Sequence, residues 1–370
     1  MEILVTRFPL ASALHGGAEN QTVWLSEGLA ALGHRLKFLG SCPVLLERFS
    51  AIGAVEHLGI GPPPVTKWGA VSFLWRRRTM QRRLIQSFDR LIVDRSSLTA
   101  VFMLSLSEKL LLTEWAAKRG SKVFWIEHDR IGTWLRWNPW LSALRRASAF
   151  ATIVCVSELS KKQYVQLGFD PKGIVVIPNG VPFSATSPEH RQADRSSFCL
   201  GCVARLSPEK GIDVLLQAIM PIPEITLTIV GRGPEEGYIR MLIAEDTQRI
   251  GVQRITLVPT LKDLHEFYNA LDALVLPSVD HDPFGLVAAE AMMRGIPVVV
   301  TNACGIADSL QNGRDAIVVK AGAVSELSAA LKSLTDSALR ERIAHTGRET
   351  AHEKFSLERM VEKYEKLLVA

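Results

Sequence analysis

The feature that most constrains the fold is a repeated alternation of short apolar segments with segments of helical length. The apolar segments are typical of buried strands, and the longer ones, such as residues 19–33, supply the crossover helices that parallel strands need. This alternation predicts a doubly wound parallel sheet. In the first half of the chain we expect strands at residues 2–8, 34–40, 90–96, 122–128 and 151–157.

The alternation breaks after residue 181 and then restarts. Residues 182–197 are polar and lack hydrophobic periodicity, which predicts a linker between domains. Two successive series predict two Rossmann-like α/β domains that face a central cleft, with ligands bound beyond the carboxyl ends of the strands. In the second half we expect strands at 198–206, 225–231, 255–260, 273–278, 297–301 and 316–320, with helices at 213–219, 264–271 and 285–294 among those between them.

The two halves also differ in charge and in aromatic content. Residues 1–180 carry 23 Lys and Arg against 13 Asp and Glu, whereas the remainder carries 20 against 25. All eight tryptophans lie at or before position 140. This asymmetry supports two domains with different partners.

Targeting and redox signals favour a cytoplasmic protein. The N-terminus lacks a basic n-region, and no later apolar run reaches about 18 residues without a charge, so we expect neither a signal peptide nor a membrane span. Five cysteines, an odd number, form no disulfide framework and suit a reducing compartment. Cys199 and Cys202 lie in an expected strand, where zinc or redox chemistry would need further partners that the sequence does not supply.

Residues suited to anion binding follow two of the expected strands. Gly16 and Gly17 precede a helix that begins near Glu19, which allows backbone N–H groups to approach an anion; an ordinary flexible turn is an equal alternative. Arg205 and Lys210 flank a turn where a diphosphate could bind, although either could be a solvated surface charge.

Further glycines mark the ends of later strands. Gly231 and Gly233 form a turn that falls short of the dinucleotide fingerprint. Gly285 permits close backbone approach just before an expected helix from about Leu286 to Arg294.

Two carboxylates, Asp282 and Glu290, lie eight positions apart around the start of this helix. Glu290 is flanked by alanines on a mainly apolar helix and requires a buried partner. A ligand hydroxyl or a neighbouring backbone group could supply it.

Taken in order, these motifs resemble the family 4 retaining glycosyltransferases of GT-B fold over nearly the whole chain. The resemblance is carried by "GGAE" near the N-terminus, "IPNGV" at 177–181, "VARLSPEKG", "VGRGPE", "DPFGLVAAEAM" and a final helix at about 357–368. It implies an acceptor-binding domain at 1–181, a linker at 182–197, a nucleotide-sugar-binding domain at 198–354 and a C-terminal helix at 355–370 that crosses back to the first domain.

The family resemblance implies transfer of a hexose from a UDP- or GDP-sugar to a glycan or lipid-linked acceptor, in bacterial-type cell-surface polysaccharide or lipopolysaccharide assembly. Glu290 would accept hydrogen bonds from the ribose, and Arg205 and Lys210 would hold the diphosphate without a metal or another cofactor. The donor-binding residues implied are Gly16, Gly17, Arg205, Lys210, Gly231, Gly233, Asp282, Phe284, Gly285, Leu286 and Glu290.

The same resemblance assigns the catalytic set as His128, Arg205, Lys210, Asp282 and Glu290. His128 would lie beside the donor sugar, and Asp129 could orient its imidazole or bind the acceptor. Attack from the front face, with the acceptor proton passing to the leaving phosphate, needs no protein nucleophile, unlike the mechanism of retaining glycosidases. The family has Glu where this chain has Asp282, so we expect an altered sugar preference.

The basic first half bears on the acceptor. A helical projection of residues 73–91 places Phe73, Met80, Leu84 and Phe88 on one face and Arg76, Arg78, Arg82 and Arg83 away from it; Arg77 interrupts the apolar stripe. Residues 134–146 again mix Trp with Arg. Such surfaces suit an anionic membrane or a lipid-linked pyrophosphate, which would place the protein peripherally on the inner face of the cell membrane. A solvated helix face is an equal alternative, and no nucleic-acid recognition motif accompanies the clusters.

Two other functions would share these motifs, because a fold does not determine a function. A GT-B sugar-nucleotide epimerase would need acid and base carboxylates at a sugar carbon. A non-catalytic sugar-nucleotide-binding protein would be expected to lose Arg205, Lys210 or Glu290, and all three are present.

Overall fold

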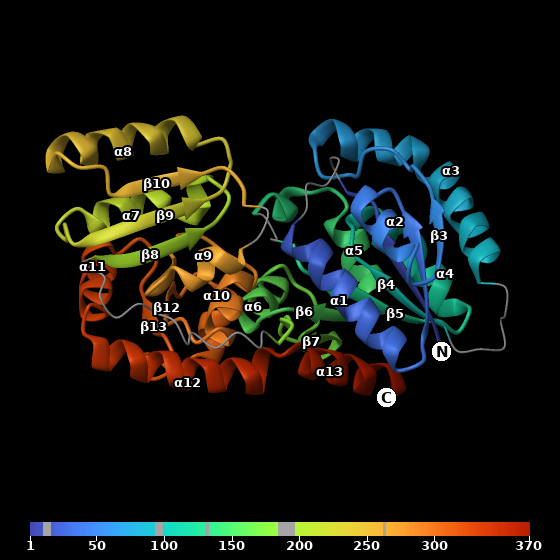
Figure 1. Ribbon diagram of the computed structural model, residues 1–370. Coiled ribbons are helices and arrows are strands. Elements are labelled where there is room, and N and C mark those ends of the chain that lie inside the picture. Colours follow the sequence, from blue (N-terminus) through green and yellow to red (C-terminus); the bar gives the residue numbers. More distant parts are fainter. Residues whose placement is uncertain (10–15, 93–98, 130–132, 184–196, 262–263) are drawn as a thin grey trace. The chain divides into compact units, whose positions relative to one another are not determined.

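The computed structural model describes residues 1–9, 16–92, 99–129, 133–183, 197–261 and 264–370 (Figure 1). The chain divides into two compact units. Unit 1 comprises Met1–Gly180 and Leu357–Ala370, and unit 2 comprises Val181–Ser356. Among the helices of these ranges, none is long and apolar enough to cross a membrane. All five cysteines are free thiols.

Unit 1 is built on a seven-stranded parallel sheet in the order β3-β2-β1-β4-β5-β6-β7. The strand order reverses between β1 and β4, which makes their carboxyl ends the topological switch point. The strands are β1 (Glu2–Arg7), β2 (Arg35–Gly40), β3 (Ala54–His57), β4 (Thr99–Met103), β5 (Lys122–Glu127), β6 (Thr152–Cys155) and β7 (Ile174–Val176).

Helices cover both faces of this sheet because successive strand residues point to opposite faces. Ile3 and Val5 pack with α1, α2 and α13, whereas Leu4 packs with α3, α4, α5 and α6, so each face has its own core. The helices are α1 (Gly17–Ala31), α2 (Pro43–Phe49), α3 (Lys67–Leu91), α4 (Leu106–Lys118), α5 (Leu141–Ser148), α6 (Glu158–Gln166) and α13 (Leu357–Val369), with 3-10 turns η1 (Thr133–Trp137) and η2 (Pro171–Gly173).

Unit 2 repeats the same plan with six parallel strands in the order β10-β9-β8-β11-β12-β13, and its switch point lies between β8 and β11. The strands are β8 (Phe198–Val203), β9 (Ile225–Val230), β10 (Ile255–Val258), β11 (Ala273–Leu276), β12 (Val298–Thr301) and β13 (Ile317–Val319). The helices are α7 (Ile212–Ile219), α8 (Glu236–Ile250), α9 (His265–Asn269), α10 (Leu286–Met293), α11 (Val324–Ser333) and α12 (Ser337–Phe355), with 3-10 turns η3 (Pro208–Lys210) and η4 (Gly305–Ser309).

The last helix, α13, belongs to unit 1, where it lies against α1 (Figure 1). A Cβ atom on Gly28 would lie 2.4 Å from a methyl group of Val361, so the two helices approach closely where glycine leaves room. Polar contacts also hold α13 to other parts of unit 1: His34 Nε2, after α1, lies 2.6 Å from Glu365 Oε2, and Lys122 Nζ in β5 donates to the Leu368 carbonyl at 2.8 Å.

The α/β fold class expected from the sequence is confirmed, and the strand expected at 90–96 is wrong in its described residues. Residues 90–96 were expected to form a strand, but α3 runs to Leu91, and residues 93–98 lie outside the described part of the chain. The helical spacing of Met80, Leu84 and Phe88 continues to Ile92, so the last apolar residues complete a helix face and β4 begins at Thr99. Most of the expected linker, residues 184–196, also lies outside the described residues.

Candidate functional site

Unit 2 brings Lys210 and Asp282 together at its switch point. Lys210 closes η3 after β8, and Asp282 follows β11, the neighbouring strand. Lys210 Nζ lies 2.6 Å from Asp282 Oδ2, which also accepts a hydrogen bond from Ser278 Oγ at 3.3 Å. Asp282 is buried and Lys210 is half-buried, so the pair fixes a cation next to a carboxylate at the sheet edge.

Backbone contacts hold the two loops that carry this pair. The Asp282 N–H donates to the Ala303 carbonyl at 2.9 Å, and the Val279 N–H donates to the Glu209 carbonyl at 2.9 Å. Gly211 has a φ of +63°, and a Cβ there would lie 2.3 Å from the Pro277 carbonyl oxygen. Only glycine satisfies both the left-handed backbone and this approach.

Arg205 lies on the same loop as Lys210 and is exposed, and its guanidinium forms no ion pair within the described ranges. Gly231 and Gly233 support this loop. Added Cβ atoms would lie 1.9 Å from the Ala204 carbonyl oxygen and 2.1 Å from the Leu206 carbonyl oxygen. The glycines therefore let the loop after β9 pack directly against the backbone on both sides of Arg205.

Glu290 lies in α10, and its partner is a side chain that sequence analysis missed. The Tyr268 hydroxyl donates to Glu290 Oε2 at 2.7 Å, and Arg294 Nη1 donates to the Glu290 carbonyl at 2.9 Å while its guanidinium lies 4.6 Å from the centre of the Tyr268 ring. Burial raises the pKa of the Glu290 carboxyl, and the Tyr268 hydrogen bond opposes this shift. Tyr268 comes from α9, twenty-two residues earlier in the chain, and no local pattern links it to Glu290.

The start of α10 is formed as expected, by Gly285 with a φ of +95° and Leu286 as the first helical residue. The Phe284 ring is buried and packs edge-on against Phe355, with ring centres 5.6 Å apart. Phe284 thus contributes its ring to the interior of unit 2.

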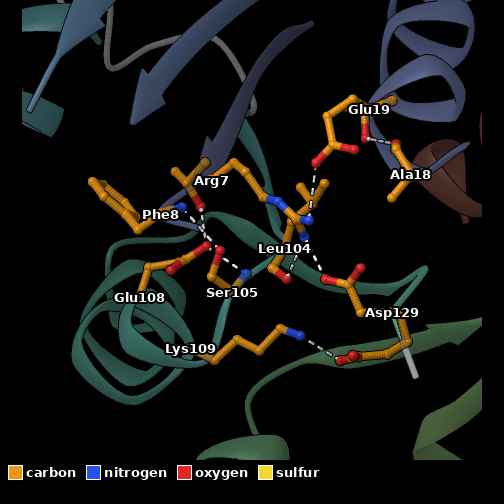
Figure 2. Close-up of polar contacts among 12 residues, drawn as sticks. Arg7, Phe8, Ala18, Glu19, Leu104, Ser105, Glu108, Lys109 and Asp129 are labelled. Atoms are coloured by element: carbon orange, nitrogen blue, oxygen red, sulfur yellow. Dashed lines mark hydrogen bonds and ion pairs between the residues drawn. The ribbon is translucent and has the colours of Figure 1, made fainter. Parts of the chain in front are cut away.

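In unit 1, Arg7 links three elements at the switch point (Figure 2). Its Nη2 lies 3.1 Å from Glu19 Oε1 in α1, and its Nη1 lies 2.7 Å from Asp129 Oδ2 after β5. Nη1 also donates to the Leu104 carbonyl at 3.4 Å. We expected Asp129 to orient the His128 imidazole or to bind the acceptor, but this carboxylate pairs with Arg7. Arg7 was missed although a charged residue ending a buried strand is a detectable signal.

His128 lies directly after β5, and both ring nitrogens are shielded from solvent. The Asn179 side chain lies close enough to favour the charged imidazole, but its contact with the ring lacks the geometry of a hydrogen bond. The side-chain oxygen of Asn179, within the "IPNGV" motif, is likewise shielded from solvent. Burial lowers the pKa of His128 to about 4, although nearby Asp129 favours the charged form. The imidazole is therefore neutral at neutral pH.

A pocket of about 360 Å³ opens beside this region, entirely within unit 1. Its polar lining includes a buried ion pair, Lys109 with Glu127, whose charged atoms lie 2.6 Å apart. Arg7, Asp129 and Tyr164 also line it. Apolar walls come from Phe8, Pro63, Val65, Leu106, Leu135 and Leu144. Charged groups beside apolar walls suit a ligand that has both hydroxyl groups and apolar faces.

The glycines near the N-terminus open α1. Gly16 is the extended N-cap, α1 begins at exposed Gly17, and the first turn carries Glu19, which pairs with Arg7. Residues 10–15, the preceding part of this loop, lie outside the described residues.

Comparison with known proteins gives matches to two family models in succession. Residues 15–184 match the model described as Glycosyltransferase Family 4, and residues 185–350 match Glycosyl transferases group 1. The chain also resembles the crystal structure of Anabaena Alr3699/HepE in complex with UDP and glucose, with a TM-score of 0.77 and 19% identity over 100% of this chain and 99% of that one. Two parallel α/β units with these neighbours define the GT-B fold class.

Within that class, the chain belongs to the family 4 glycosyltransferases. Among curated proteins it is 24% identical to the capsular polysaccharide biosynthesis glycosyltransferase CapM of Staphylococcus aureus, over 58% of this chain and 60% of the relative. It is 29% identical to the lipopolysaccharide core biosynthesis glycosyltransferase LpsD of Rhizobium meliloti, over 58% of this chain and 62% of the relative. The chain thus spans about three fifths of the length of these two relatives.

Proposed function

We propose that this protein is a retaining glycosyltransferase that moves a hexose from a UDP- or GDP-sugar to a glycan or lipid-linked acceptor in bacterial-type surface polysaccharide or lipopolysaccharide assembly. Family membership supports transferase activity. The names of CapM and LpsD support the pathway, and the UDP and glucose in the HepE structure support a nucleotide-sugar donor.

The observation that carries the proposal is the Lys210–Asp282 pair at the switch point of unit 2. A diphosphate bound next to Lys210 would also be within reach of Arg205 on the same loop. Lys210 would act as a point charge, and the planar Arg205 guanidinium would bind two phosphate oxygens at once. Asp282 would accept hydrogen bonds from sugar hydroxyls. Glu290 would bind the ribose through the oxygen that does not accept from Tyr268.

The chemistry follows from where charge develops. As the bond between the sugar and the phosphate breaks, its electron pair moves to the departing phosphate, and two cations stabilise this charge more in the transition state than in the ground state. The acceptor oxygen bonds to the anomeric carbon from the same face, and its proton passes to the phosphate. Because Arg205 and Lys210 supply the countercharge, we propose that no metal is required.

His128 would serve as a neutral partner for a donor-sugar hydroxyl. With a pKa of about 4, its imidazole adds no countercharge at neutral pH, but it can donate one hydrogen bond and accept another. A sugar hydroxyl would satisfy a ring nitrogen that makes no hydrogen bond of good geometry to the described residues, beside the Asn179 side chain.

We place the acceptor in the 360 Å³ pocket of unit 1. Sugar rings present hydroxyls at their edges and C–H groups on their faces, which match the Lys109–Glu127 pair and the surrounding apolar walls. Asp282, one carbon shorter than the Glu of the family, would select among donor sugars.

Thermal shift with UDP- and GDP-hexoses tests the donor site. Binding to the folded state at 100 times the Kd adds about 2.7 kcal/mol, or roughly 5–10 °C for a unit of this size. We expect either the UDP-hexoses or the GDP-hexoses to give this shift. Lys210→Ala and Glu290→Ala should each abolish both the thermal shift and sugar transfer, while the protein stays folded. Lys332→Ala and Glu341→Ala, at exposed sites of unit 2, are matched controls. Equal shifts in all four variants would refute the assignment.

A further inference from the structure

Unit 1 carries three tryptophans with most of their side chains in solvent. Trp68 and Trp75 lie on α3 and are 86% and 82% exposed, and Trp137 ends η1 and is 84% exposed. A large aromatic side chain usually buries most of its surface, so three exposed ones in one unit indicate a surface with a partner.

The outer side of α3 adds aliphatic groups and unpaired cations. Val71 and Leu74, between the two α3 tryptophans, are about half exposed. The helix contains seven Lys and Arg and a single acid, Asp89. Its exposed arginines at positions 78, 82 and 83 form no ion pair with any residue in the described ranges, whereas the Arg77 guanidinium lies 5.7 Å from the centre of the Trp140 ring. The opposite side of α3 is its core face, with Phe73, Met80, Leu84 and Phe88 buried as the sequence predicted.

Contacts beside Trp137 hold η1 against the start of α3. Asn138 Nδ2 donates to the Pro64 carbonyl at 2.6 Å, and Trp140 Nε1 donates to the Ala70 carbonyl at 3.1 Å. The Trp140 and Phe73 rings meet edge to face with centres 5.0 Å apart. Trp137 therefore lies close to the first turns of α3. The side chain of Trp134 lies outside the described residues.

This surface borders the pocket described above. Pro63 and Val65, just before α3, and Leu135 in η1 line the pocket, and the segments that they belong to lead directly into Trp68 and Trp137. A partner on the α3–η1 surface would thus lie next to the pocket.

We infer that the α3–η1 surface, defined by Trp68, Val71, Leu74, Trp75, Arg78, Arg82 and Trp137, docks on an anionic lipid bilayer. Tryptophan favours the headgroup region, and arginines attract acidic headgroups. Single-stranded nucleic acid also binds aromatic and basic side chains, but exposed Val71 and Leu74 have no role in base stacking, whereas they bury readily at the acyl boundary. The docked bilayer would present a lipid-linked acceptor to the pocket, and this last step rests on the proposed function.

Flotation with vesicles tests the inference without donor or acceptor. We expect the full-length protein to float with phosphatidylglycerol–phosphatidylcholine vesicles, with a blue shift of tryptophan fluorescence, and to remain unbound with phosphatidylcholine alone. Each cation near an anionic surface changes partition roughly fivefold, so Arg78→Glu with Arg82→Glu should lower it roughly 25-fold or more. Trp68→Ser with Trp75→Ser should weaken flotation and reduce the blue shift caused by vesicles at unchanged net charge, with Trp137 supplying the remainder.

The charge-matched control is Lys332→Glu with Arg342→Glu on exposed sites of unit 2, which should float like the wild type. An equal loss of flotation in this control, or a wild-type protein that does not float with anionic vesicles, would overturn the inference. Tighter binding to a 20-nucleotide single-stranded DNA than to vesicles, lost in the Arg78/Arg82 variant, would also overturn it in favour of nucleic acid. If the proposed function fails instead, the UDP- and GDP-hexose thermal shifts vanish while flotation persists.

Discussion

Glu108 in α4 shows how burial controls a single charge in unit 1. Its Oε1 accepts a hydrogen bond from the Ser105 N–H at 2.6 Å, as Figure 2 shows, but its Oε2 is buried without a partner among the described residues. Burial raises the pKa of Glu108 to about 7, against the opposing effects of Lys109 and Arg7. The folded state therefore favours the protonated acid.

The consequence is a pH dependence of unit 1 stability. A folded pKa above the unfolded value gives stabilisation that is complete below pH 4.5 and is lost as pH rises through 7. The shift corresponds to on the order of 3 kcal/mol. Glu108→Gln should flatten this loss between pH 5 and 8 in urea unfolding followed by tryptophan fluorescence. Glu114→Gln, at an exposed site of the same helix, should retain it; a Glu108→Gln profile parallel to wild type would contradict the account.

For single residues, the sequence indicated the candidate functional side chains more successfully than it indicated their contact partners. Lys210, Asp282 and Glu290 stood out because charges followed apolar strands or sat in an apolar helix. Their partners were less accessible: Tyr268 is far from Glu290 in the chain, and Lys109 meets Glu127 only after α4 packs on the sheet. Pairings of this kind depend on tertiary structure, which local spacing does not encode.

At the scale of elements, most buried strands were predictable, but the central strand β4 was missed, although all five of its residues are buried. The short edge strand β3 is largely exposed, so it lacks the apolar run that marks its neighbours, and it was missed. The strand expected at 90–96 failed because its first residues belong to α3. Helix and strand compete for such short apolar segments, and periodicity alone does not decide between them.

Arg254, between α8 and β10, joins three elements of unit 2. Its guanidinium binds both oxygens of Asp246 at 2.8 Å and donates to three backbone carbonyls near the end of α7 and the start of β9. Asp246 also pairs with Arg249, which is more exposed.

Arg254→Ala should destabilise unit 2 by about 3–5 kcal/mol, because it leaves buried carbonyls and part of a carboxylate without a donor. Arg249→Ala, which removes the exposed partner of the same carboxylate, should cost about 1 kcal/mol or less. Hydrogen exchange in β9 and β10 measures both, since unit 2 contains no tryptophan. Similar losses of hydrogen-exchange protection in the two variants would show that burial does not determine how much each arginine contributes to the stability of unit 2.

For the whole molecule, the six strands of unit 2 follow the same order as the first six of unit 1, to which β7 is added at one edge. Both units place charged residues at the switch point. In unit 1 these are Arg7 and its carboxylates, and in unit 2 they are Lys210 and Asp282. This repetition was foreseeable from two series of alternating strands and helices. The docking of α13 on α1 follows from Gly28 and Val361, which sequence periodicity does not connect.

In the proposed reaction, the sugar leaves its nucleotide and is transferred with retention of configuration. The direct measurement is ¹H NMR of sugar released from UDP-glucose, or from GDP-mannose if that donor binds, with water replacing the natural acceptor. We expect the α-anomer to appear first, before mutarotation, and no release by Lys210→Ala. Initial appearance of the β-anomer, or of an epimerised nucleotide sugar, would contradict the account.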